Sequence, residues 1–240
     1  MTRVPPQSLF MGVMVLSAGV FLQSCRSQTA QEQSGASTNG GSQPTATTAS
    51  QHARPRVVVL GDSLTAGYGL VATQTFPYLL QQRMDREGYD FEVVNAGVSG
   101  DTSAGGVRRL DWALDGDVKV LIVALGGNDG LRGLSIEEMK KNIGEIVRRA
   151  RERRITVILA GMQAPPNYGP EYAAAFREAF RDIAREHRVP LIPFLLNNVA
   201  GNAELNLQDG IHPNSRGTAI VSDTVWSALR PVLDKMSANQ

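Results

Sequence analysis

The sequence predicts an α/β protein in which a parallel sheet is covered by helices on both faces. From Arg56 onward, short runs of apolar, mostly β-branched residues alternate with longer segments whose apolar residues follow helical spacing. The run at 57–60 is continuously apolar, the run at 118–125 is apolar except for Lys119, and each is followed by glycine, as expected for strands buried on both faces. Strictly alternating strands and helices favour parallel pairing with crossover helices.

The expected elements follow from this periodicity in order. Pro190 and Pro193 make the last strand short or an edge strand, because proline cannot donate to a sheet ladder. Ser135 with Glu138 has the spacing of a capping box and begins the third helix. The strands are expected at 57–60, 91–95, 118–125, 155–160 and 189–194, and the helices at 76–87, 105–114, 135–153, 171–187 and 215–236.

Composition restricts the possible classes of function. The 240 residues carry a formal net charge of +1, which offers no electrostatic basis for binding nucleic acid. The chain has one cysteine and three histidines, so an intrachain disulfide is excluded and a zinc site is not expected. We therefore expect no metal and no cofactor.

The first 25 residues have the pattern of an export signal. Arg3 supplies a positive charge, and the apolar run at 9–22 is shorter than the roughly 20 residues that span a bilayer. The run ends in Leu-Gln-Ser-Cys at 22–25, which resembles a bacterial lipobox except at Gln23. Cys25 would then be the lipidated first residue of the mature protein; the alternative is ordinary secretory cleavage.

Residues 26–54 are rich in Ser, Thr, Gln and Gly and contain almost no large apolar side chains. Such a segment cannot bury enough surface to offset the entropy of ordering it, so it is predicted to be a flexible tether. The folded domain is expected at 55–238. The expected location is outside the cytoplasm, in a bacterial periplasm or on a membrane through the lipid anchor.

Two separate segments supply the groups that serine-type acyl transfer requires: a nucleophile, a base and a carboxylate that orients the base. Ser63 follows the first strand, and His212 lies three residues beyond Asp209, close enough for one turn to hold both side chains. The surroundings of Ser63 are not a G-x-S-x-G elbow, since position 65 is threonine. Taken singly, the two segments could instead be a helix N-cap and a polar loop before the last helix.

Two further loops follow strands and face the same edge of the sheet. The small residues at 95–103 allow close approach to a ligand, and Gly100 can offer its N–H to a developing oxyanion. Asn128 can aim its side-chain amide at the same point. The alternatives are a tight βα loop and an Asx-type turn. Asp129 has no partner carboxylates or histidines near it in sequence and is expected to be structural.

Together these segments resemble the SGNH (GDSL-type) hydrolase superfamily, and most closely its bacterial branch of acyl-CoA thioesterases, lysophospholipases and arylesterases. The resemblance rests on the stretches at 61–68, 99–103, 126–133, 166–169 and 209–214. It implies a three-layer, flavodoxin-like α/β/α sandwich with a five-stranded parallel sheet in the order 2-1-3-4-5. It also implies that Ser63 is the nucleophile, His212 the base and Asp209 its orienter. The implied oxyanion hole is the N–H groups of Ser63 and Gly100 with the Asn128 side chain.

These residues predict a serine hydrolase that cleaves carboxylic esters or thioesters through an acyl-enzyme on Ser63. Since an exported enzyme meets little acyl-CoA, lysophospholipids or small esters are the expected substrates. The acyl group is expected to lie along the loops after the third and fourth strands, with an apolar lining that includes Leu131, Pro165, Pro166 and Tyr168. Two alternatives stay open: an O-acetylesterase acting on cell-wall or other carbohydrate, and a non-catalytic, lipid-anchored binding module.

Overall fold

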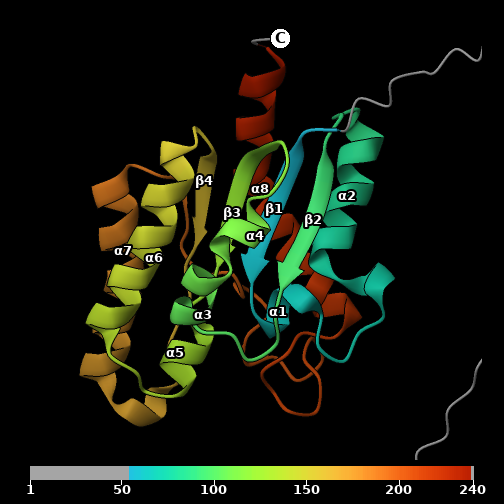
Figure 1. Cartoon of the computed structure of the whole chain (residues 1–240). Helices are drawn as coiled ribbons and strands as arrows, with labels where there is room; N and C mark the ends of the chain where they lie inside the picture. The colour runs from blue at the N-terminus through green and yellow to red at the C-terminus, as the bar shows by residue number, and fades with distance from the viewer. Residues whose placement is uncertain (1–53, 239–240) are drawn as a thin grey trace, which may run out of the picture. The chain divides into compact units, whose positions relative to one another are not determined.

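A computed structural model describes residues 54–238 and contains one five-stranded, entirely parallel sheet (Figure 1). The strand order is β2-β1-β3-β4-β5, as the family resemblance implied. Figure 1 shows the C-terminal ends of β1, β2 and β3 pointing to the same edge of the sheet. The strands are β1 (Arg56–Gly61), β2 (Glu92–Gly97), β3 (Val118–Ala124), β4 (Thr156–Ala160) and β5 (Leu191–Ile192).

Helices cover both faces of this sheet. Helices α2 and α8 pack together on one face, and α3, α6 and α7 pack in a row on the other. The helices are α1 (Ser63–Ala66), α2 (Phe76–Glu87), α3 (Ser103–Arg108), α4 (Leu110–Ala113), α5 (Gly127–Leu131), α6 (Ile136–Glu152), α7 (Pro170–His187) and α8 (Ser215–Ser237), with 3₁₀ turns η1 (Ala72–Gln74) and η2 (Pro166–Tyr168).

The hydrophobic core is centred on β1 and β3. Every residue from Val57 to Leu60 and from Val120 to Val123 is at most 1% exposed, so burial on both faces is confirmed for these strands. Removing so much β-branched and aliphatic surface from water is the main favourable contribution to this fold. A rigid centre of this kind holds the loops that leave it in fixed relative positions.

Three strands end at the same level. Gly61 of β1 pairs with Gly97 of β2 on one side and with Ala124 of β3 on the other. The loops after these strands therefore start side by side. Gly97 allows a close approach between backbones: a Cβ there would lie 2.3 Å from the backbone nitrogen of Ala66 in α1. The absence of that side chain lets the loop after β2 contact the helix that carries Ser63.

Three elements differ from the sequence prediction. The helix expected at 105–114 is two short helices, α3 and α4, separated at Arg109. Residues 127–131, expected as a loop, form α5 after Gly126 takes a left-handed conformation (φ 102°). The last strand does not fill 189–194; it is a two-residue edge strand, as the flanking prolines predicted, because proline cannot donate to the ladder.

Between residues 54 and 238, no helix is both long and apolar enough to cross a bilayer. The expected export signal, Cys25 and nearly all of the expected tether lie outside the described residues.

Candidate active site

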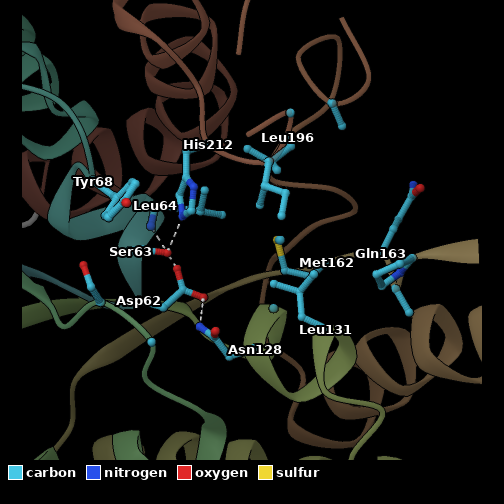
Figure 2. A pocket seen from close by; sticks show the side chains of 18 of the residues that line it. Asp62, Ser63, Leu64, Tyr68, Asn128, Leu131, Met162, Gln163, Leu196 and His212 are labelled. Carbon is cyan, nitrogen blue, oxygen red and sulfur yellow. Dashed lines mark hydrogen bonds between the residues drawn. The ribbon is translucent and has the colours of Figure 1, made fainter. Parts of the chain in front are cut away.

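Ser63 is the first residue of α1, directly beyond the end of β1. Asp62 caps this helix, because its carboxylate accepts a hydrogen bond from the Leu64 backbone N–H at 3.0 Å. The helix-cap interpretation of the Gly-Asp-Ser turn is therefore correct for Asp62, and it leaves the Ser63 hydroxyl free to point outward. Figure 2 shows that hydroxyl directed at the His212 ring.

The structure brings Ser63, His212 and Asp209 into one hydrogen-bonded chain. His212 Nε2 lies 2.9 Å from Ser63 Oγ, and His212 Nδ1 lies 2.7 Å from Asp209 Oδ2 (Figure 2 shows the first contact). An ionised carboxylate can only accept, so Nδ1 carries the proton and Nε2 is left to accept one from the serine. This is the arrangement that activates a hydroxyl group as a nucleophile.

Asp209 is held in its ionised form by its own loop. The backbone N–H groups of His212 and Ile211 both donate to Asp209 Oδ1, at 3.0 and 2.9 Å. With the added bond from the His212 ring, they lower the pKa of Asp209 from 3.8 to about 2. The carboxylate that orients the imidazole therefore stays charged throughout the neutral and mildly acidic range.

The loop that carries His212 is itself fixed at both ends. Asn206 and Pro213 form an antiparallel bridge, and the Leu207 N–H donates to the His212 carbonyl at 2.7 Å. The side chain of Asn214 then caps α8 by accepting from the backbone N–H groups of Arg216 and Gly217. The capping role belongs to Asn214, which leaves Asp209 and His212 available to face the serine.

Tyr68 covers one side of the imidazole. Its ring centroid lies 4.5 Å from that of His212, with 36° between the ring planes. Tyr68 is 54% exposed, so this ring is not held by the core and packs on the histidine at the edge of the cavity. The contact limits rotation of the His212 ring from the side opposite the cavity interior (Figure 2).

The predicted oxyanion donors surround the serine from two other loops. Gly100 has φ 80°, a left-handed conformation that favours glycine, and lines the same cavity as Ser63. Asn128 lies in the first turn of α5, where its Nδ2 donates to the Asp101 carbonyl at 2.9 Å and, more weakly, to Asp62 Oδ2 at 3.3 Å. These bonds fix which way the amide points.

Asp62 is a buried carboxyl beside the predicted nucleophile. It is 3% exposed, and burial raises its pKa from 3.8 to about 6. The hydrogen bond from Leu64, the charge of His212 and the bond from Asn128 each oppose this rise and do not cancel it. Asp62 therefore changes charge in a range where Asp209 stays ionised.

A cavity of about 600 Å³ extends from Ser63 along the ends of β3, β4 and β5. Figure 2 shows Leu131, Met162 and Leu196 grouped on the side of the cavity away from Tyr68. Its apolar wall is formed by Leu131, Met162, Ala164, Pro165, Phe194 and Leu196.

Of the predicted lining residues, the structure brings Leu131 and Pro165 to this wall. Tyr168 does not line the cavity. It is 41% exposed, and its hydroxyl donates to the Leu131 carbonyl at 3.0 Å, so it supports the wall from outside. Pro166 lies in η2, and its predicted contact with substrate stays a prediction.

Asp129 links α5 to α3. It is 4% exposed, and its carboxylate accepts from the Ser103 N–H at 2.9 Å and from the Ser103 hydroxyl at 2.6 Å. This pairing is what a structural carboxylate requires. Within residues 54–238, no group of three or more His, Cys, Asp or Glu side chains is placed to hold a metal ion.

The comparisons with known proteins agree with this geometry. Residues 59–220 match the model of the GDSL-like Lipase/Acylhydrolase family, and the chain belongs to that family. The protein is thus a carboxylic ester hydrolase.

Individual relatives cover most of the domain. The esterase TesA of Pseudomonas aeruginosa is 42% identical over 184 residues, which is 76% of this chain and 92% of that protein. The thioesterase 1/protease 1/lysophospholipase L1 of Escherichia coli is 34% identical over 179 residues, 74% of this chain and 85% of that protein. The crystal structure of the esterase EstA from Pseudoalteromonas, inhibited by monoethylphosphonate, aligns with a TM-score of 0.71 at 33% identity and covers 75% of this chain and 98% of that one.

Sequence reasoning missed several residues of the site. Met162 is a single apolar residue in the loop after β4, and Leu196 ends a short apolar run after β5; only their positions shortly after a strand could have indicated them. The burial of Asp62 was not foreseen, although the residue lies inside the Gly-Asp-Ser motif. Tyr68 was part of a matched stretch, but its contact with His212 depends on how α1 turns.

The raised pKa of Asp62 predicts a specific pH dependence of stability. A carboxyl whose folded pKa lies above its unfolded value favours folding below about pH 4 and loses that contribution as the pH rises through about 6. Relative to Asp62→Asn, the free energy of unfolding of the parent should therefore fall by on the order of 2–3 kcal/mol between pH 4 and pH 7. Urea unfolding of both proteins across this range measures the difference, and parallel curves would contradict the assignment.

Proposed function

We propose that the protein hydrolyses esters and thioesters of acyl chains through a covalent acyl-enzyme on Ser63. His212 takes the Ser63 proton as the oxygen attacks the substrate carbonyl, and then gives it to the leaving alcohol or thiol. The acyl group stays on Ser63 until water, deprotonated by the same imidazole, attacks it. The acid then leaves, and the proton on His212 returns to the serine.

The observation that carries this proposal is the continuous chain from Ser63 Oγ through both ring nitrogens of His212 to Asp209. An isolated serine hydroxyl is a poor nucleophile at neutral pH. Here a base with the correct tautomer lies at bonding distance, and its partner carboxylate stays charged because its pKa is about 2. These are the conditions for general-base activation.

The oxyanion hole in this proposal consists of the N–H groups of Ser63 and Gly100 with the side-chain amide of Asn128. All three residues line the cavity, and they come from the loops after β1, β2 and β3. The bond from Asn128 to the Asp101 carbonyl leaves the second amide hydrogen, held only weakly by Asp62, for the substrate. A single donor of this kind contributes roughly 3 kcal/mol to the transition state.

The substrate class follows from the apolar wall and from the relatives. A cavity of about 600 Å³ with a mostly aliphatic wall suits an acyl chain better than a sugar ring, which would require several polar partners. The relatives are named as an esterase and as a thioesterase and lysophospholipase. Lysophospholipids or small esters are the substrates proposed here.

The proposed location is outside the cytoplasm. It rests on the sequence pattern of an export signal at 1–25, a lipobox-like Cys25 and a polar tether. Lipidation of Cys25 would hold the domain at a membrane surface while the tether lets it reach substrates there.

A fluorophosphonate probe tests the mechanism. It should attach to Ser63 and abolish hydrolysis of nitrophenyl esters, and Ser63→Ala should lose both the label and at least about 10⁴-fold in kcat. Ser99→Ala is the control, because Ser99 is a second serine that lines the cavity, and this variant should keep the label on Ser63. Full activity in Ser63→Ala would end the proposal.

A series of nitrophenyl esters from acetate to decanoate tests the substrate class. The parent should keep or increase its kcat/KM toward the longer chains, because the apolar wall binds them. Met162→Trp should lower kcat/KM for decanoate at least about tenfold relative to acetate, since the larger ring fills the cavity. Tyr78→Trp on α2, outside the cavity, is the control and should leave the ratio of kcat/KM for decanoate to kcat/KM for acetate unchanged. A steep fall beyond acetate in the parent would favour carbohydrate deacetylation.

A further inference from the structure

We propose that Arg109 is a positioning residue that sets the relative places of all three oxyanion donors. The inference rests on the oxyanion hole proposed above and goes beyond it by naming what holds that hole together. Arg109 does not line the cavity, and no motif of the sequence marked it.

The Arg109 guanidinium makes three short hydrogen bonds to three different segments. Its Nε donates to Asp101 Oδ2 at 2.6 Å, one terminal nitrogen donates to the Ala96 carbonyl at 2.6 Å, and the other donates to the Gly61 carbonyl at 2.7 Å. The side chains of Arg109 and Asp101 are only 17% and 11% exposed. A charge-assisted, largely buried set of bonds is stronger and more directional than an exposed pair.

Two of the three acceptors lie within two residues of an oxyanion donor in the sequence. Gly61 is two residues before Ser63, at the end of β1. Asp101 directly follows Gly100 in the loop after β2. The backbone carbonyl of Asp101 accepts the bond from Asn128 Nδ2. One guanidinium therefore connects, directly or through Asp101, the segments that supply the Ser63 N–H, the Gly100 N–H and the Asn128 amide.

The local backbone is arranged to make this possible. Arg109 lies between α3 and α4 with φ −105° and ψ 8°, which interrupts the helix that periodicity predicted. Gly105 leaves room for the partner, because a Cβ there would lie 1.5 Å from Asp101 Oδ1. The split helix and the glycine are both explained by the space and direction that the Arg109–Asp101 pair requires.

The planar fork of arginine is needed for this geometry. Lysine carries its charge on one nitrogen and cannot reach two strand-end carbonyls and a carboxylate together. Arg109→Lys therefore keeps the charge but removes the link between the strands. Since transition-state stabilisation falls steeply when donors move by a fraction of an ångström, the loss should appear in kcat.

Arg56 provides a matched control on the same two strands. It lies at the opposite edge of the sheet, where its Nε donates to Glu92 Oε2 at 2.9 Å and a terminal nitrogen donates to the Asp115 carbonyl at 3.2 Å. It thus also joins β1 to β2 through an ion pair, and it joins β1 to the turn before β3 through a backbone carbonyl. Any general effect of loosening these strands should appear in Arg56→Lys as well.

The test compares Arg109→Lys, Arg56→Lys, Asp101→Asn and Asn128→Ala in the full-length protein. We measure kcat and KM for a nitrophenyl ester, the inhibition constant of an alkylboronic acid that forms a tetrahedral adduct on serine, and the Tm. Arg109→Lys should lower kcat at least about tenfold with KM changed less than about threefold. Its boronate inhibition constant should rise by a similar factor. Arg56→Lys should keep kcat within about twofold whatever its Tm.

Asp101→Asn and Asn128→Ala show whether a negative result contradicts the role of Arg109 or the proposed oxyanion hole. If Arg109→Lys does not fold, Asp101→Asn carries the test, because it weakens the same pair and should show the same loss in kcat and boronate binding. A folded Arg109→Lys or Asp101→Asn with kcat and boronate affinity within about twofold of the parent overturns the inference. If Asn128→Ala loses activity in that case, the oxyanion hole stands and only the role of Arg109 is wrong. If Asn128→Ala is also fully active, the proposed oxyanion hole itself fails.

Discussion

The hydrogen bond between Ser63 Oγ and His212 Nε2 is the contact on which the rest of the site depends. It joins residues 149 positions apart in the chain at 2.9 Å, so neither segment can form the site alone. The parallel sheet makes this meeting possible, because β1 delivers Ser63 to the same edge where the loop before α8 presents His212. The Asn206–Pro213 bridge and the Asp209 side chain then fix the imidazole, so that a bond across the whole fold has a defined length and direction.

The two sides of the serine are stabilised by different physical means. On the base side, backbone N–H groups hold the Asp209 carboxylate ionised in a partly exposed loop. On the side of the proposed oxyanion hole, Asp62 is buried with a raised pKa, and Asp101 is paired with Arg109. Burying carboxyl groups beside Ser63 costs folding free energy. Such groups are retained only where they are paired or hold other residues in place. Here they orient α1 and the Asn128 amide.

Much of the fold and of the candidate triad could be predicted because the signals are local. Apolar runs marked β1 and, with Lys119 as its one polar residue, β3, and the short spacing of Asp209 and His212 placed both on one turn. The features that the sequence did not predict depend on contacts between distant segments. Tyr168, in η2 after β4, bonds to the Leu131 carbonyl at the end of α5, and α3 ends just before Arg109, whose side chain reaches the ends of two strands. Periodicity contains no information about such contacts, nor about the burial that raises the pKa of Asp62.

The most direct measurement is a crystal structure of the protein with a phosphonate covalently bound to Ser63, an inhibitor class also seen on the related esterase EstA. We expect the phosphoryl oxygen to accept hydrogen bonds, at about 2.7–3.1 Å, from the Ser63 and Gly100 N–H groups and from Asn128 Nδ2, with His212 Nε2 beside the ester oxygen. The alkyl substituent of a longer phosphonate should lie along Leu131 and Met162. A phosphoryl oxygen directed away from Gly100 and Asn128, or a phosphonate bound to another residue, would contradict the account.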